Sequence, residues 1–195
     1  METLTKEQKQ AVKHVTKALD VLGFEFNQST IKTPERWVKA ITEFGIGQKT
    51  GAEFDFTKFP GPARNQDTGM IVVSGIEFSG ICEHHLFPFF GYAHVGYIRN
   101  DSIAGLSKLP RSVRLCLHQA GVQEHMAASL ADYLQENLRP FWLGVVVQAT
   151  HTCMTCRGAE ANNAMTTNSV YRGGYFKERH LYIQEFLTYL QNRLQ

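Results

Sequence analysis

The chain has 195 residues, of which 43% are hydrophobic and 19% are charged, and its formal net charge at pH 7 is +2. These values are ordinary for a globular protein with a hydrophobic core. The small net charge argues against general nucleic-acid binding, so any anion site has to be local. No apolar run approaches the roughly 20 residues of a membrane helix, and residues 1–10 lack the apolar region of a signal peptide. We therefore expect a cytoplasmic protein that binds neither nucleic acid nor membranes.

The first predicted element is an amphipathic helix near the N-terminus. Thr5 and Gln8 have the spacing of a capping box, and apolar residues follow at helical spacing up to Gly23. The sequence thus predicts a helix that begins after Thr5 and ends before Gly23.

A second helix is predicted over residues 33–45. Thr33 is the expected cap, Pro34 suits the first turn, and Gly45 ends the helix. Residues 51–69 follow, rich in Gly, Pro and polar residues without a clear period, and we interpret them as a loop.

Strands and helices then alternate in blocks. Residues rich in β-branched and aromatic side chains predict strands over 70–78, 92–98, 143–153 and 169–176. Helical patterns predict a helix over 107–121 with Ser107 as its cap, a second over 122–138 stopped by Pro140, and a final helix with apolar residues from 183 to 194. Strands separated by a helical pair favour an α+β fold with a largely antiparallel sheet. We expect an N-terminal helical arm over residues 1–50 and one domain over residues 51–195.

A group of metal-competent residues begins in "ICEHH", residues 81–85. Thiols stay reduced in the cytoplasm, so the four cysteines of the chain are candidates for metal binding, catalysis or burial rather than for disulfides. Cys82 and His85 have a Cys-x-x-His spacing that lets both side chains reach one ion across a turn. Adjacent side chains of an extended chain point to opposite sides, so His84 and His85 are expected to have different roles.

The predicted strand over 143–153 supplies the other half of this group. If the strand alternates throughout, Val145, Val147, Ala149, His151 and Cys153 share one face. Cys82, His85 and Cys153 then form a set of two thiolates and one imidazole with a free fourth position. Three protein ligands are typical of catalytic zinc, which lowers the pKa of a bound water. His84 and His151 would flank the ion as proton carriers.

Two alternatives remain open from the residues alone. Cys156 could join Cys82, His85 and Cys153 and close a structural Cys3His site. Strand alternation argues against this, because residue 156 would fall on the face opposite Cys153. The Cys-x-x-Cys spacing could also be redox-active, although no helix N-terminus is expected after it to stabilise a thiolate.

The remaining histidines and Cys116 have simpler interpretations. Surface or satisfied core positions are expected for His14, His94, His118 and His180. Cys116 lies in an apolar helical pattern, and we interpret it as a packing residue.

A second group of residues is basic. Lys108 and Arg111 fall in the first turn of a predicted helix, and Arg36 falls in the first turn of another. Cations there oppose the helix dipole, so an anionic ligand would explain them, although solvated surface charge is the alternative. Together with Arg157, close to Cys153, they indicate a substrate that carries phosphate.

These motifs resemble the GTP cyclohydrolase I family. The similar segments are "SGICEHHLFPFFGYAHVGYI", "IAGLSKLPR", "VQE" and "ATHTCMTCRG", in the family's order, together with "TPERW" and "TTNS". The resemblance covers roughly residues 5 to 190, and CEHH with a distant His-x-Cys is its most specific part.

The resemblance implies roles for individual residues. The family's zinc ligands fall on Cys82, His85 and Cys153, which leaves Cys156 out. Its catalytic groups fall on His84, His151, Ser107 and Gln123. Its substrate-binding groups fall on Arg36, Lys108, Arg111 and Arg157 for the triphosphate, on Ser107 and Gln123 around the nucleotide, and on Glu124 for the guanine edge.

The resemblance also implies a reaction and an assembly. The family converts GTP and water into 7,8-dihydroneopterin triphosphate and formate, which can start folate, pterin-cofactor or 7-deazaguanine pathways. The implied fold is the tunnelling (T-) fold, assembled as a homodecamer with active sites between subunits and without an animal-type regulatory N-terminal extension. A different purine nucleotide as substrate, or a non-catalytic zinc- and nucleotide-binding protein, are the rival hypotheses.

Three departures from the family pattern concern triphosphate binding. His125 stands where the family usually has arginine, residues 116–121 lack the basic residues often found there, and residues 159–165 are atypical. No role is assigned to Glu83.

Overall fold

The structure is a computed structural model that describes residues 4–45, 54–61 and 69–191. The chain divides into two compact units, Met1–Lys49 and Thr50–Gln195. None of the helices in these described ranges is long and apolar enough to cross a membrane.

The first unit contains helices α1 (Lys6–Val21) and α2 (Thr33–Glu43). The predicted capping box is confirmed, because the Thr5 hydroxyl accepts from the Gln8 amide at 3.2 Å and the Gln8 side chain accepts from the Thr5 amide at 2.9 Å. The prediction that Thr33 caps α2 is wrong. Thr33 is already helical, Lys32 occupies the cap position, and no side chain caps this end.

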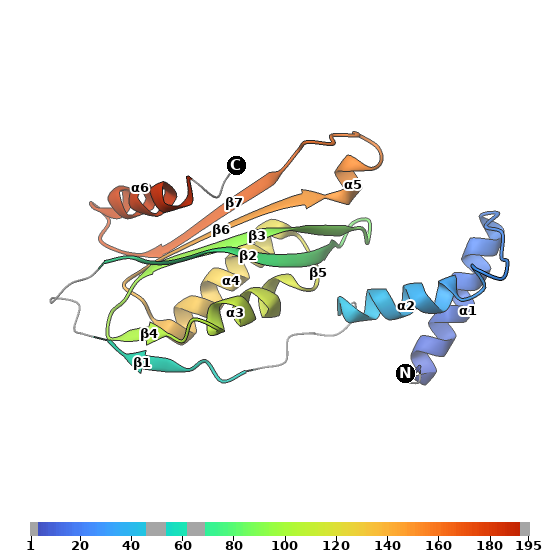
Figure 1. The fold of residues 1–195 in the computed structure, drawn as a ribbon, viewed down its shortest axis with the longest axis horizontal. Coiled ribbons are helices and arrows are strands. Elements are labelled where there is room, and N and C mark those ends of the chain that lie inside the picture. Colours follow the sequence, from blue (N-terminus) through green and yellow to red (C-terminus); the bar gives the residue numbers. More distant parts are fainter. Residues whose placement is uncertain (1–3, 46–53, 62–68, 192–195) are drawn as a thin grey trace. The chain divides into compact units, whose positions relative to one another are not determined.

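The second unit is built on a five-stranded sheet in the order β5-β2-β3-β6-β7 (Figure 1). Its strands are β2 (Ile71–Cys82), β3 (Pro88–Ile98), β5 (Ala120–Gly121), β6 (Trp142–His151) and β7 (Thr166–Gly173). All neighbours are antiparallel except β2 and β5, which are parallel. Two short strands, β1 (Lys58–Pro60) and β4 (Ser102–Ala104), pair separately. The predicted α+β fold with a largely antiparallel sheet is therefore confirmed.

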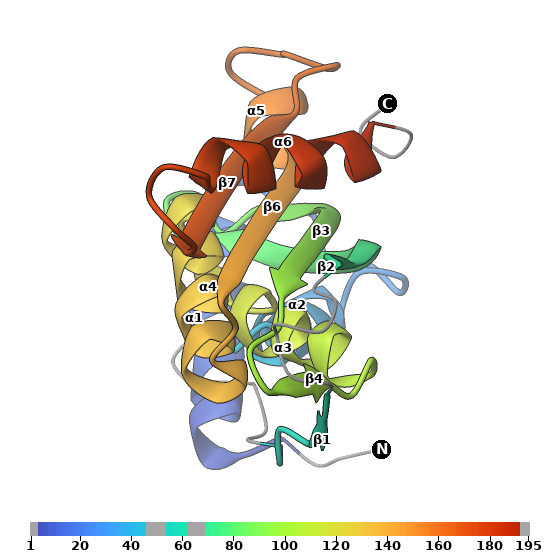
Figure 2. The same ribbon diagram turned by 90° about the vertical axis from the view of Figure 1, so that its left-hand side faces the viewer.

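Helices cover both faces of the sheet (Figure 2). Helices α3 (Lys108–Leu117) and α4 (Gln123–Leu138) pack on one face and bury the larger core, which includes Val113, Leu130 and Val147. Helix α6 (Arg179–Leu190) packs Phe186 and Leu190 against Trp142 on the other face. Figure 1 shows α6 at one end of the sheet and the short helix α5 (Thr152–Thr155) at the opposite end, beside the β2–β3 turn.

Several boundaries differ from the sequence expectation. The helix predicted over 107–121 ends at Leu117, because the chain turns at His118 and adds β5 to the edge of the sheet. Ser107 does occupy the cap position of α3, but its side chain makes no capping bond. The predicted loop over 51–69 contains β1, and its residues 51–53 and 62–68 lie outside the described residues. The last apolar position of the predicted C-terminal helix, Leu194, also lies outside them.

Candidate metal centre and active site

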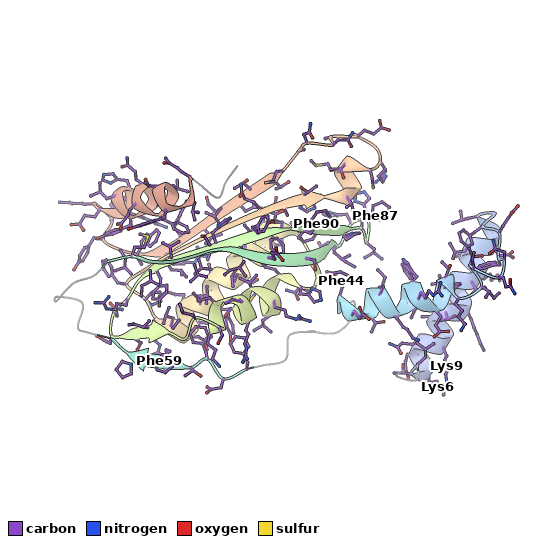
Figure 3. The ribbon with its side chains drawn as sticks, viewed as in Figure 1. Lys6, Lys9, Phe44, Phe59, Phe87 and Phe90 are labelled. Carbon is purple, nitrogen blue, oxygen red and sulfur yellow. The ribbon has the colours of Figure 1, made fainter. Side chains whose placement is uncertain are left out.

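The turn between β2 and β3 brings Cys82 and His85 together. The Cys82 carbonyl accepts from the amides of His85 at 3.4 Å and Leu86 at 2.8 Å, and the Cys82 amide donates to Phe87 O at 2.9 Å. Leu86 adopts a left-handed φ of 55°, which reverses the chain at this point. The turn thus closes on Cys82 and presents residues 83–87 at the end of the sheet, where Figure 3 shows Phe87.

The third residue of the candidate metal set reaches this end from β6. The expectation that the strand continues through Cys153 is wrong, since β6 ends at His151 and residues 152–155 form helix α5. Cys153 therefore lies on the first turn of a short helix, not on the strand face of His151. The Thr152 hydroxyl donates to Pro88 O at 2.6 Å and joins the start of α5 to the start of β3.

Cys82, His85 and Cys153 converge in the structure. One ligand atom from each, two Sγ atoms and one imidazole nitrogen, can be chosen so that all lie within 4.8 Å of one another. Cys82 is buried, His85 is exposed and Cys153 is intermediate, so the cluster lies at the surface with one protected side. These three residues are the set that the Cys-x-x-His spacing and the distant cysteine predicted.

His84 lies as close to Cys82 as His85 does. Nδ1 of His84 is 3.7 Å from Cys82 Sγ, and Nδ1 of His85 is 3.9 Å from it. The two rings are 6.4 Å apart and inclined by 74°. They occupy a turn, so the strand-alternation argument for their divergence does not apply. The difference between them is that His85 also approaches Cys153.

Cys156 lies outside the three-residue cluster among the described residues. It is exposed, and its thiol donates to Thr152 O at 2.7 Å as it would in a continued helical turn. The strand-alternation argument against Cys156 fails, because 152–155 is helical. This helix overlaps the Cys-x-x-Cys segment but does not follow it, since the next helix or strand in the described residues is β7.

Two side chains hold His151. Its ring stacks on Phe89, with centroids 4.5 Å apart and planes inclined by 14°. This contact follows from the strand register, which pairs Phe89 with His151. His151 Nε2 lies 2.7 Å from Oε1 of Gln123, the first residue of α4. Burial lowers the pKa of His151, and the nearby Glu124 carboxylate opposes that shift.

The protein surroundings of Cys153 oppose its ionisation. Burial, followed by the neighbouring Cys82 thiol, raises the pKa of Cys153, while the charge of Arg157 acts in the opposite direction. A thiol becomes a strong ligand only as a thiolate, so a cation at this position would have to displace its proton.

The predicted substrate-binding residues of the second unit occupy three elements. Ser107 and Arg111 are exposed at the start of α3, and Lys108 places its ammonium 5.6 Å from the centre of the Phe54 ring. Gln123 and Glu124 begin α4, and Arg157 follows α5. The strand pair Cys82–Gly121 places the start of α4 next to the metal cluster.

Arg36 belongs to the first unit. It is exposed in the first turn of α2, as its sequence position predicted.

The departures from the family pattern also have positions in the structure. His125 is exposed on α4. The 116–121 segment contains β5, and the Gln119 side chain donates to Cys116 O at 2.8 Å. The 159–165 segment contacts α5, because the Ala161 amide donates to Met154 O at 3.0 Å. Glu83 is exposed, and its amide donates to Gly121 O at 3.4 Å.

The simpler interpretations hold for several residues. Cys116 is buried in the core, where burial raises the pKa of its thiol to about 12. His94 is buried in β3, and its Nδ1 accepts from the Gly75 amide at 3.2 Å. His118 ends α3 with its Nδ1 3.1 Å from Ser79 O. His14 and His180 are exposed on helices.

A groove of about 450 Å³ lies elsewhere, between β2 and α3. Its lining residues are Ile76, Glu77, Phe78, Ser79, Pro110, Arg114 and His118. None of the predicted metal or catalytic residues lines it, so the chemistry indicated by the cysteine and histidine cluster does not belong to this groove.

Sequence comparison decides the family. The profile of GTP cyclohydrolase I matches residues 11–191. The chain belongs to the GTP cyclohydrolase I family. Its relatives include GTP cyclohydrolase 1 of Rickettsia prowazekii, 36% identical over 190 residues that cover 96% of this chain and 97% of the relative. GTP cyclohydrolase 1 of Saccharomyces cerevisiae is 34% identical over 98% of this chain and 80% of its own length. That of Hydrogenobaculum is 40% identical over 82% of this chain and 85% of its own length.

Among solved structures, an archaeosine synthase QueF-Like in the apo form has a TM-score of 0.44 and 13% identity, covering 54% of this chain and 95% of that one. The family membership rests on the sequence match alone.

Proposed function

We propose that this chain is a zinc-dependent GTP cyclohydrolase I. It hydrolyses GTP at C8 of the purine and rearranges the product to 7,8-dihydroneopterin triphosphate, with release of formate. The observation that carries the proposal is the convergence of Cys82, His85 and Cys153 in a chain of this family. Relatives named GTP cyclohydrolase 1 occur in both bacteria and yeast, which supports the same activity here.

The donor set fits zinc. Two thiolates and an imidazole suit this borderline-soft ion, whose tetrahedral bonds of about 2.3 Å to sulfur and 2.0–2.1 Å to nitrogen separate ligand atoms by about 3.6–3.8 Å. The 3.9 Å between Cys82 Sγ and His85 Nδ1 is close to this spacing. When bound, zinc supplies Lewis-acid activation of water at neutral pH.

The histidines move protons in this proposal. Burial lowers the pKa of His151, which favours a neutral ring that can take a proton and return it to a ring nitrogen of the purine. His84, beside the Cys82 thiol, is the second proton carrier. His85 is reserved for the ion, since it is the histidine that also approaches Cys153.

The polar residues around the cluster bind the nucleotide. Glu124 is exposed at the start of α4, where its carboxylate can accept from N1–H and the 2-amino group of guanine, which are both donors. In this proposal Lys108, Arg111, Arg157 and Arg36 bind the triphosphate. Ser107, which directly precedes Lys108 at the start of α3, contacts the nucleotide. We further propose the family's T-fold homodecamer, with active sites between subunits.

The rival closed site is tested by one pair of cysteine variants. We expect Cys156→Ser to keep about one zinc per chain, because Cys156 is exposed and lies outside the cluster. Cys153→Ser should lose most of its zinc, since it removes one of three ligands. Metal content per chain by mass spectrometry checks both variants after identical purification. Zinc loss in Cys156→Ser would show that the zinc site is a closed Cys3His site and not an open three-ligand site.

The rival substrates are tested by direct competition. GTP should give formate and a pterin, whereas ATP lacks the donor pair that Glu124 accepts from and should give neither. Comparing GTP, dGTP and ATP in one formate assay decides this, and Glu124→Gln serves as the variant that weakens the guanine contact. Equal turnover of ATP and GTP would contradict a preference for guanine and favour an enzyme that acts on other purine nucleotides.

A further inference from the structure

We propose that Gln123 is a positioning residue that fixes the hydrogen of His151 on Nε2, so that His151 exchanges protons through Nδ1. The inference rests on the proposed function, in which His151 carries a proton. It assigns to Gln123 a role different from the nucleotide contact that the family resemblance implies.

The orientation of the Gln123 amide is set by two backbone carbonyls. Its Nε2 lies 3.1 Å from Val147 O and 3.1 Å from Thr166 O. A carbonyl oxygen only accepts hydrogen bonds, so the NH2 group has to face both of them. Gln123 is 2% exposed, so water cannot readily replace these partners. The amide oxygen, Oε1, is therefore the atom that faces His151.

The hydrogen position on His151 follows from this orientation. Oε1 is an acceptor and lies 2.7 Å from Nε2, so Nε2 has to carry the hydrogen. In a neutral imidazole the other nitrogen then holds the lone pair. The assignment is the same for the protonated ring, which carries hydrogen on both nitrogens. Within the described part of the chain Nδ1 has no hydrogen-bond partner, so Nδ1 is the nitrogen free to exchange a proton.

The ring is also fixed in direction. Phe89 is fully buried and stacks on His151, while Gln123 joins α4 to β6 and β7 through its two carbonyl partners. Both amide hydrogens and one lone pair of Gln123 are thus engaged inside the protein. A buried side chain engaged in this way orients His151 and has little left to offer a nucleotide.

The experiment is solid-state NMR of the zinc-loaded full-length protein with ¹³C- and ¹⁵N-labelled histidine, at an alkaline pH where the imidazoles are neutral. Ring ¹³C and ¹⁵N shifts distinguish the two tautomers, and His151→Asn identifies the His151 signals among those of eight histidines. We expect the Nε2–H tautomer in the wild type. Gln123→Met should convert His151 to a mixture, whereas Gln148→Met, which removes an exposed bond to Thr167, should leave it unchanged.

Kinetics supply a second readout. Gln123→Met should lower kcat by about 10- to 100-fold, part of the general acid–base contribution, while KM for GTP changes little. An Nδ1–H tautomer in the wild type, an unchanged His151 signal in Gln123→Met, or an effect confined to KM would each overturn the proposal. The wild-type spectrum decides the hydrogen position even if Gln123→Met does not fold. Because the NMR readout needs no turnover, failure of the proposed function would be recognised separately, by a correct tautomer in a protein inactive on GTP.

Discussion

At the scale of single residues, the neighbours of the cysteines separate them into two classes, although Cys82 is as buried as Cys116. Cys116 is enclosed by the core, whereas Cys82 and Cys153 meet at the surface end of the sheet. Helical periodicity alone indicated the packing role of Cys116. The thiol of Cys116 can therefore be used to test burial in the core without affecting the metal site.

Cys116 should make the protein less stable at alkaline pH. Its pKa is raised from 9.0 to about 12 in the folded state, so the unfolded chain loses this proton first as the pH rises. The contribution of Cys116 is thus fully present below pH 9 and is lost toward pH 12, with a slope of up to about 1.4 kcal/mol per pH unit.

The measurement is denaturant unfolding between pH 8 and pH 11 of the wild type and of Cys116→Val, which has no ionisable group. The difference in the free energy of unfolding should move in favour of the variant as the pH rises. A difference that stays constant across this range would contradict the buried, protonated thiol.

At the scale of secondary-structure elements, the site depends on how α5 is attached to the sheet. Cys82 and His85 share one turn, but Cys153 comes from the far end of β6. The bond from the Thr152 hydroxyl to Pro88 O joins these two segments next to the cluster. Pro88 starts the strand that follows the turn 83–87, so this bond adds to the β3–β6 pairing in holding the two thiol-bearing segments together.

Thr152→Val should therefore weaken zinc binding without unfolding the protein. The variant keeps the shape of the side chain but removes the donor, and loss of such a supporting bond typically costs about 10-fold or more in metal affinity. Thr152→Ser restores the hydroxyl and should restore the affinity. Thr155→Val, in the same helix, serves as the matched control.

Competition of each variant with a chromophoric chelator measures the zinc affinity directly. Equal affinities for wild type, Thr152→Val and Thr155→Val would show that α5 is held by other contacts.

The elements also show what the sequence can predict. The apolar residues of α4 recur at helical spacing, and β2 and β6 contain runs of β-branched residues. The structure contains all three elements. Strands β1, β4 and β5 have two or three residues each, too short for a period, and form because a partner strand is present. The prediction of strand alternation was wrong beyond His151, because nothing in "THTC" indicates where β6 ends and α5 begins.

The candidate metal set was predictable because Cys-x-x-His spacing is local and the distant cysteine has few competitors. The partners of His151 were not. Phe89 meets His151 through the β3–β6 register, and Gln123 reaches it from α4. Neither relation has a local sequence signal, although Phe89 and Gln123 both lie within segments similar to the family.

At the scale of the whole molecule, the proposed assembly makes a prediction about Arg36. This arginine is on α2, in the unit that precedes the sheet, while Lys108, Arg111 and Arg157 belong to the second unit. If active sites lie between subunits, Arg36 of one subunit serves the triphosphate bound at another subunit's metal cluster.

Mixed assemblies test this sharing. Arg36→Ala and His151→Asn are each expected to be nearly inactive alone. In randomly mixed oligomers made by co-expression, about a quarter of the sites would combine an intact Arg36 with an intact His151 from different chains. Activity near that fraction is expected, and mixing the purified variants without subunit exchange is the control. Activity no higher than the sum of the parents would contradict shared sites.

The most direct test of the account is formate released from GTP by the purified, zinc-loaded protein. We predict one formate for each GTP consumed, together with one dihydroneopterin triphosphate detected by its fluorescence after oxidation, and loss of both products on removal of zinc. A protein that holds one zinc per chain at Cys82, His85 and Cys153 but releases no formate from GTP would contradict it.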